Sequence, residues 1–193
     1  MHIDKKLNLV IPIERDDGSV LYVHSEPLDN EVFERYFLVL SKAFAMIYAE
    51  GLTVIAGPRV AGLVLKKVAM DMNAWDGEGG VDHGLMNEIR RLSNVIVPTP
   101  AGWQTMPLHN ARQDGTLTAE EVGEAEGQIA FFMLTSALNK RRQLLVIMAG
   151  VNRLWGAQTT PLHSTEYAAS LRTSTEAGST GENDPVKPLS HPF

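Results

Sequence analysis

Residues 7–25 read LNLVIPIERDDGSVLYVHS, and their pattern predicts how the chain begins to fold. Apolar residues occupy every second position from 7 to 13, so they share one face of a β-strand. Asp17-Gly18 predicts a two-residue type I′ turn, because both central residues of that turn need positive φ. SVLYVHS then returns as the second strand of a hairpin. Pro12 has no N–H to donate, so we expect the first strand at a sheet edge.

A lone hairpin is only marginally stable in water, so its apolar face must pack on helices or on another subunit. From residue 29 the apolar residues recur every three or four positions, which predicts helices. We expect these helices over about 29–50, 58–72, 83–95, 118–139 and 141–154. Pro58 suits a first helical turn, and Thr118-Ala119-Glu120-Glu121 matches a capping box. Residues 98–117 are expected to form a long connection that packs on the core through its apolar side chains.

These elements predict a mainly α protein with an N-terminal β-hairpin, which is an α+β fold. Residues 1–156 would form the hairpin and a helical, bundle-like body. Residues 157–193 would form a short anchor segment and a polar C-terminal tail. From residue 172 the chain has too little apolar content to offset the entropy lost on ordering, so we expect a flexible arm or one ordered by a partner.

The composition restricts the partners that this chain can have. Its formal net charge is −6, which argues against nucleic acid, because binding a phosphate backbone needs a clustered cationic surface. The basic cluster Lys140, Arg141 and Arg142 fits a solvated helix face better than a phosphate site. The longest apolar runs are far shorter than the roughly 20 residues of a membrane span, and the N-terminus lacks a signal-peptide pattern. We therefore expect an intracellular protein without membrane contact.

No residue pattern in the chain indicates catalysis. The sequence has no cysteine, which excludes disulfides, cysteine zinc sites and thiol chemistry. No two histidines have the i, i+4 spacing of a helical metal site, and no nucleophile or phosphate-loop motif is present. An unfamiliar enzyme site around Asp76, Asp82, His83 and His109 is one hypothesis, but a solvated glycine-rich loop explains the first three better. We expect no enzyme activity, no cofactor and no metal.

The segment WGAQTTPLHSTEYAASLRTST, residues 155–175, follows the last expected body helix. Residues 156–161 predict a hinge, and Ser164 or Thr165 could cap a short helix that ends near residue 171. The candidate partner-binding residues are Trp155, Leu162, Tyr167 and Leu171. The two aromatic side chains among them, Trp155 and Tyr167, suit a core edge or an interface. Deleting residues 157–193 is expected to leave the body folded and to weaken partner or subunit binding.

This segment and the N-terminal block MHIDKKLNLVIPIERDDGSVLYVHSEPLDNEVFERYFLVLSKAFAMIYAEGL resemble tail assembly chaperones of long-tailed bacteriophages. The resemblance implies a chaperone of virion morphogenesis, present in the host cell cytoplasm and absent from the finished virion. Its partners would be the tape measure protein and the tail tube protein, and it could also form a homo-oligomer. The alternative is a virion structural protein whose C-terminal arm contacts a neighbouring subunit.

Overall fold

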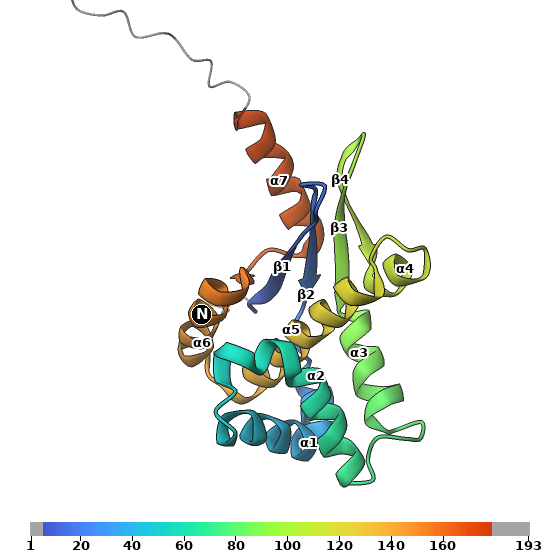
Figure 1. The fold of residues 1–193 in the computed structure, drawn as a ribbon, viewed down its shortest axis with the longest axis vertical. Helices are drawn as coiled ribbons and strands as arrows, with labels where there is room; N and C mark the ends of the chain where they lie inside the picture. The colour runs from blue at the N-terminus through green and yellow to red at the C-terminus, as the bar shows by residue number, and fades with distance from the viewer. Residues whose placement is uncertain (1–5, 179–193) are drawn as a thin grey trace, which may run out of the picture.

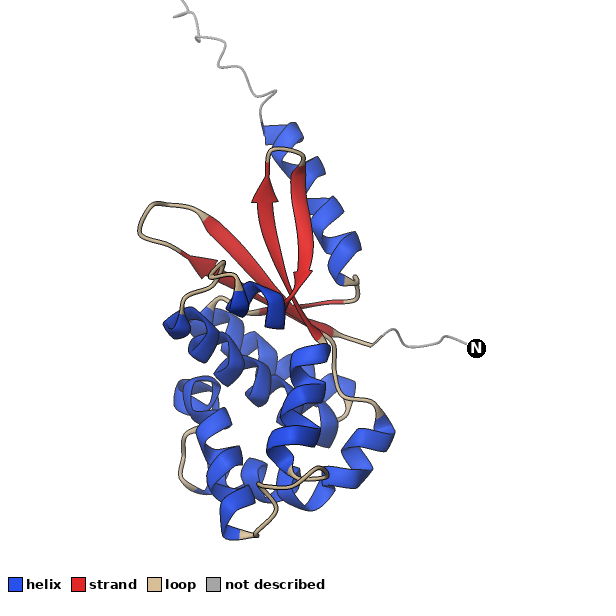
Figure 2. Ribbon diagram, turned by 90° about the vertical axis from the view of Figure 1, so that its right-hand side faces the viewer, coloured by secondary structure: helices blue, strands red, loops and turns tan. Residues whose placement is uncertain are grey.

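The computed structural model describes residues 6–178 of the chain. Within them, a five-stranded antiparallel sheet has most of the helices gathered at one end and α7 alongside its strands (Figures 1 and 2). The elements in chain order are β1 (Asn8–Glu14), β2 (Val20–Ser25), α1 (Asn30–Ala49), α2 (Thr53–Asp71), the π-helical turn η1 (Val81–Leu85), α3 (Met86–Arg91), β3 (Ser93–Thr99), β4 (Gly102–Pro107), α4 (Leu108–Gln113), α5 (Ala119–Leu138), α6 (Arg141–Trp155), β5 (Gln158–Thr160) and α7 (Ser164–Gly178). The predicted α+β class is confirmed, and we call α1 to α6 the helical body.

The N-terminal hairpin is present, but its turn differs from the prediction. The Gly18 N–H donates to the Arg15 carbonyl, and of the loop residues only Gly18 has a positive φ, of 80°. The loop therefore has three residues and ends in a left-handed glycine, so the type I′ prediction is wrong. The Asp17 carboxylate stabilises this loop by accepting hydrogen bonds from the Ser19 N–H and hydroxyl.

Strand β1 is the second strand of the sheet, whose order is β4-β3-β2-β1-β5. The prediction of an edge strand is therefore wrong for residues 8–10, which pair with β5. Pro12 lies beyond the end of this short ladder and pairs in register only with Tyr22 of β2. On the side of β5 its missing N–H leaves no ladder position unfilled.

The two faces of the sheet are covered by different parts of the chain. On the inner face, Leu9, Ile11 and Val23 are at most 1% exposed and belong to one hydrophobic core with the helical body. The centre of that core is α5, where Phe131 and Phe132 are also fully buried. The outer face carries the alternate residues of the same strands and contacts α7 through β3 and β4. Alternate residues of the stretch 7–25 thus contribute to the inner and the outer face of the sheet.

Helix α5 begins as its sequence predicts. The Thr118 hydroxyl accepts from the Glu121 N–H, and the Glu121 carboxylate accepts from the Thr118 N–H, which completes the capping box. Glu121 also pairs with Arg15 of the hairpin loop, with 2.7 Å between Arg15 Nε and Glu121 Oε1. The Arg15 hydrogen bond is the main reason that the pKa of Glu121 falls to about 2. One carboxylate therefore caps α5 and ties the hairpin to it.

Helix α2 begins at Thr53, five residues before the predicted start, and Pro58 lies inside it. A proline within a helix cannot donate to the carbonyl four residues earlier, which here belongs to Val54. The Trp155 indole N–H donates to that carbonyl at 2.9 Å. The helix tolerates Pro58 because a residue distant in sequence replaces the missing hydrogen bond. Nearby, a Cβ on Gly127 would lie 2.7 Å from the Pro58 carbonyl oxygen, so this glycine lets α2 and α5 pack closely.

The predicted helix over residues 83–95 is wrong in its last four residues. The chain forms η1 and the short helix α3, and then enters β3 at Ser93. Val95 and Ile96 are both fully buried although they point to opposite faces of the sheet. Consecutive β-branched residues suit such a strand, which is covered on both faces. The expected long connection contains β4 and α4 as well.

Candidate partner-binding site

The segment after α6 adds a short strand to the sheet and then continues into α7. Gln158–Thr160 form β5, which pairs antiparallel with residues 8–10 of β1, and Ala157 is fully buried. The predicted hinge over residues 156–161 is therefore wrong, because residues 158–160 in the middle of this stretch are paired in a ladder. The short helix was expected to end near residue 171 and the tail to begin at residue 172, but α7 continues to Gly178, so both of these bounds are wrong. The rest of the expected tail, beyond residue 178, lies outside the described residues. A deletion from residue 157 would remove a strand and uncover the outer face.

Leu162 anchors this segment through its backbone. Its carbonyl accepts from Asn8 Nδ2 and from His24 Nε2, each at 2.9 Å. Both donors come from the outer face and are almost fully buried. Burial lowers the pKa of His24, and the hydrogen bond to Leu162 opposes that change. Since the carbonyl can only accept, His24 donates through its Nε2–H, and its Nδ1 has no hydrogen-bond partner among the described residues.

Tyr167 covers the outer face from α7. Its ring meets the Tyr22 ring edge-on, with 5.8 Å between centroids, and its hydroxyl accepts from Gln158 at 2.9 Å. Tyr22 also contacts Trp103 of β4 and lies opposite the buried Ile96 in the β-ladder. Burial raises the pKa of Tyr167, as expected for a phenol withdrawn from water. The phenol thus has contacts within this chain.

The structure separates the four predicted partner-binding residues into two groups. Leu162, Tyr167 and the half-buried Leu171 belong to the segment over the outer face. Trp155 ends α6, where it packs against the body core and donates to Val54. Each has intramolecular contacts, and binding of a partner by these residues stays a prediction.

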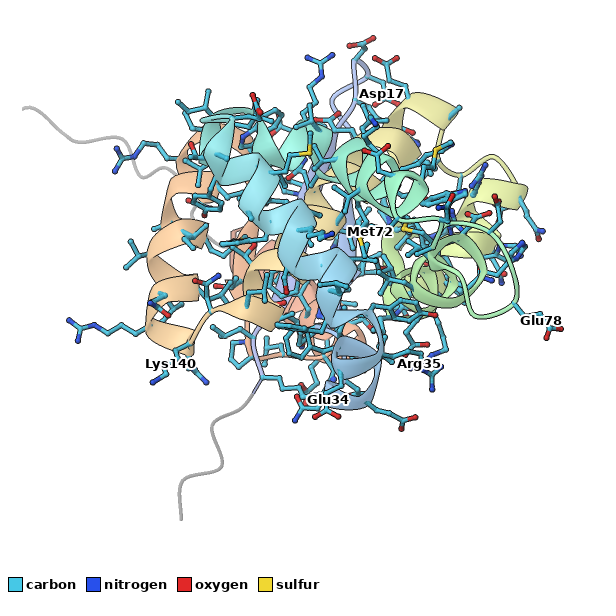
Figure 3. All side chains as sticks on the ribbon, turned by 90° about the horizontal axis from the view of Figure 1, so that it is seen from below. Asp17, Glu34, Arg35, Met72, Glu78 and Lys140 are labelled. Carbon is cyan, nitrogen blue, oxygen red and sulfur yellow. The ribbon has the colours of Figure 1, made fainter. Side chains whose placement is uncertain are left out.

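The helical body leaves large apolar side chains in contact with solvent. They lie on α1, α2 and α6, with 38% to 72% of each exposed: Phe37, Leu38, Met46, Ile55, Leu63, Met70, Leu145, Val146 and Leu154. Figure 3 views this end of the molecule from below, with Lys140 labelled at the start of α6. The sequence reading missed the exposure on α6. The signal that could have found it is the run of residues 141–155, which is amphipathic, basic and without any acid.

The residues of the enzyme hypothesis do not meet in one cleft. His109 lines a hollow of about 410 Å³ between α3, α4 and α5, together with Arg90, Arg112 and Glu126. Asp76, Asp82 and His83 do not line that hollow. Within residues 6–178, no group of three histidines or acids is arranged to hold a metal ion. In the same range, no helix combines the length and apolar character needed to cross a membrane.

Comparisons of the chain with protein-family models, curated proteins and solved structures gave no match. The functional argument therefore depends on the chain's own residues and on the resemblance of its two end segments.

Proposed function

We propose that this protein is a tail assembly chaperone of a long-tailed bacteriophage. It binds the tape measure protein in the host cell cytoplasm and recruits tail tube subunits. The observation that carries the proposal is the exposed apolar side chains on three helices of the body. Amphipathic helices bind to such surfaces by inserting apolar residues at helical spacing.

The rest of the fold supports a binding role for the body. Its exposed side chains project from helices that are held by one buried core, so their positions are set before a partner arrives. Such preorganisation lowers the entropic cost of association. The resemblance of the two end segments indicates which helical partner this surface serves. A long helical protein with exposed apolar stripes needs such cover until the tail tube encloses it.

The test is coexpression of this protein with the tape measure protein of the same phage. We expect the two to copurify, and the tape measure protein to be insoluble when expressed alone. A triple variant, Leu38→Asp, Leu63→Asp and Val146→Asp, places one charge on each of the three helices and should lose this binding. The control Arg112→Glu alters an exposed residue of α4 and should bind as the wild type does.

Failure of the wild-type protein to bind either the tape measure protein or the tube protein would contradict the proposal. Mass spectrometry of purified virions distinguishes the chaperone from the alternative, a virion structural protein. A chaperone should be absent from them, whereas stoichiometric amounts would identify a virion structural protein.

A further inference from the structure

The outer side of α6 carries a regular strip of side chains. Leu144, Met148 and Val151 face the core and are at most 5% exposed. On the opposite side, Arg142, Val146, Ala149 and Arg153 recur at spacings of four, three and four, which aligns them along one helix face. Val146, at 72%, is more exposed than any other large apolar side chain in the described residues.

Apolar surface flanks this strip on both sides. Leu145 and Leu154 are 44% and 54% exposed. Beside Val146 lies a hollow of about 370 Å³, whose lining includes Asn139, Arg142 and Ile147. A hollow with an aliphatic wall and a cation at its rim suits an apolar anchor residue that has an acidic neighbour.

The charge of this face is opposite to that of the protein. Helix α6 contains no Asp or Glu, although the whole chain has a net charge of −6. Among the described residues, neither Arg142 nor Arg153 forms an ion pair. With a rise of 1.5 Å per residue, the two arginines lie about 16 Å apart along the axis, with the apolar part of the strip between them.

We propose that the outer face of α6 binds an acidic amphipathic helix of a partner protein. The partner packs apolar residues against Val146 and Ala149, and small Ala149 permits a close approach of the two axes. Two carboxylates of the partner, about three helical turns apart, face Arg142 and Arg153. The assignment of this helix to the tape measure protein rests on the proposed function. The inference that α6 binds an acidic helix does not depend on it.

An anionic lipid surface fits this face less well than a helix does. Stable membrane anchoring combines a broad apolar face with a polybasic patch. Here the exposed apolar side chains of α6 are aliphatic, and Trp155 donates its N–H within the protein. The acidic remainder of the chain would be repelled by the lipid. Two arginines with apolar side chains between them along one line match the face of a single partner helix.

The direct test uses synthetic helical peptides and the full-length protein. The first peptide, of about 20 residues, carries two Glu eleven positions apart with Leu at the two intervening positions that match Val146 and Ala149. A second peptide has Gln, and a third has Lys, in place of Glu. We expect the Glu peptide to bind at least about tenfold more tightly than the Gln peptide, because opposite charges meet across a partly desolvated contact.

Charge reversal in the protein identifies the surface. The variant Arg142→Glu with Arg153→Glu should bind the Glu peptide at least about tenfold more weakly than the wild type does, and it should bind the Lys peptide instead. The matched control, Lys42→Glu with Arg112→Glu, reverses two exposed cations elsewhere and should change nothing. Val146→Asp should also abolish binding. Leu63→Asp, at a position of α2 that is 69% exposed, should not.

Several results would overturn the inference. Equal binding of the Glu and Gln peptides, or of the wild type and the reversed variant, would contradict it. So would binding to vesicles of phosphatidylserine and phosphatidylcholine without peptide binding. Self-association of the protein that the reversal abolishes, again without peptide binding, would assign the face to a second copy. If the peptides bind α6 but the tape measure protein does not copurify, the proposed function is contradicted. The inference that α6 binds an acidic helix is then still supported.

Discussion

Helix α6 and the segment that follows it differ in how their apolar residues are used. After α6, the Leu162 carbonyl and the Tyr167 ring contact the outer face of the chain's own sheet. On α6, Val146 and the two arginines of the strip face solvent. Aromatic residues near the end of a chain therefore do not by themselves indicate a partner surface. The side chains left uncovered after the sheet and core have formed are better candidates.

The junction of the two regions gives the largest expected effect. Trp155→Ala should lower the free energy of unfolding by about 3 kcal/mol, because it removes buried ring surface and leaves the Val54 carbonyl without its donor. Trp155→Phe keeps most of the packing and should cost about 1 kcal/mol. Urea denaturation measures both. A Trp155→Ala protein of unchanged stability and reduced partner binding would contradict this structural role and support the prediction that Trp155 binds a partner.

Tyr167→Ala tests whether α7 is bound mainly to its own sheet. The change removes the edge contact with Tyr22 and the hydrogen bond from Gln158, so we expect a loss of about 1–2 kcal/mol that is local to this region. Hydrogen exchange should accelerate in β5 and α7 and stay slow in α5. Tyr167→Phe, which loses only the hydroxyl, should show a smaller change. Acceleration of α5 as well would mean that the segment unfolds together with the body.

Acid should loosen the same segment through His24. Burial lowers the pKa of His24 in the folded state, so the folded protein binds fewer protons than the unfolded one. The stability that neutral His24 contributes to the folded state is fully present above its unfolded pKa of about 6.5. It is lost as the pH falls toward the lower pKa of the folded state. Nearby Glu26 opposes this shift and His163 adds to it. Once exchange rates are corrected for the intrinsic pH dependence of the amides, protection of α7 should therefore be lower at pH 5.5 than at pH 7.5.

His24→Gln is the control for this titration, because it retains an amide donor for the Leu162 carbonyl and does not titrate. In this variant, exchange in α7 should depend on pH only through the intrinsic chemistry of the amides. The same acid sensitivity in His24→Gln as in the wild type would assign the effect to another group.

The smallest effect on stability is expected from the strip on α6. Arg142→Glu with Arg153→Glu should change the free energy of unfolding by no more than about 0.5 kcal/mol, because both side chains are exposed. Glu at position 142 suits the positive end of the helix dipole, and Glu at position 153 opposes the negative end, so these contributions largely cancel. Thermal unfolding measures the net effect of the two substitutions on stability. A large loss of stability would show that the arginines support the fold.

Local patterns predicted much of the fold. The capping box at Thr118 and the helical spacing after residue 29 placed α1, α5 and α6, because the determining contacts lie within a few residues. The start of α2 could not be predicted in this way. The helix accommodates a proline at position 58 because Trp155, 101 residues after Val54 in the sequence, donates to the Val54 carbonyl in its place.

The missed strands have a similar cause. Strand β3 is covered on both faces and lacks clear alternation, so Val95 and Ile96 fit the end of a helix equally well. Strand β5 has three residues and exists through its pairing with β1. The intramolecular contacts of Tyr167 and Leu162 could not be predicted from the sequence, because their partners come near only when the sheet has folded. On α6, the basic cluster was visible, but its alignment with the exposed Val146 needed the structure.

The most direct test of this account is the dissociation constant of the tape measure protein for three forms of the full-length chain. The forms are the wild type, Arg142→Glu with Arg153→Glu, and Tyr167→Ala. We predict that the charge reversal weakens binding at least about tenfold and that Tyr167→Ala binds as the wild type does. Loss of binding in Tyr167→Ala with unchanged binding in the reversed variant would contradict the account and assign the partner to the C-terminal segment.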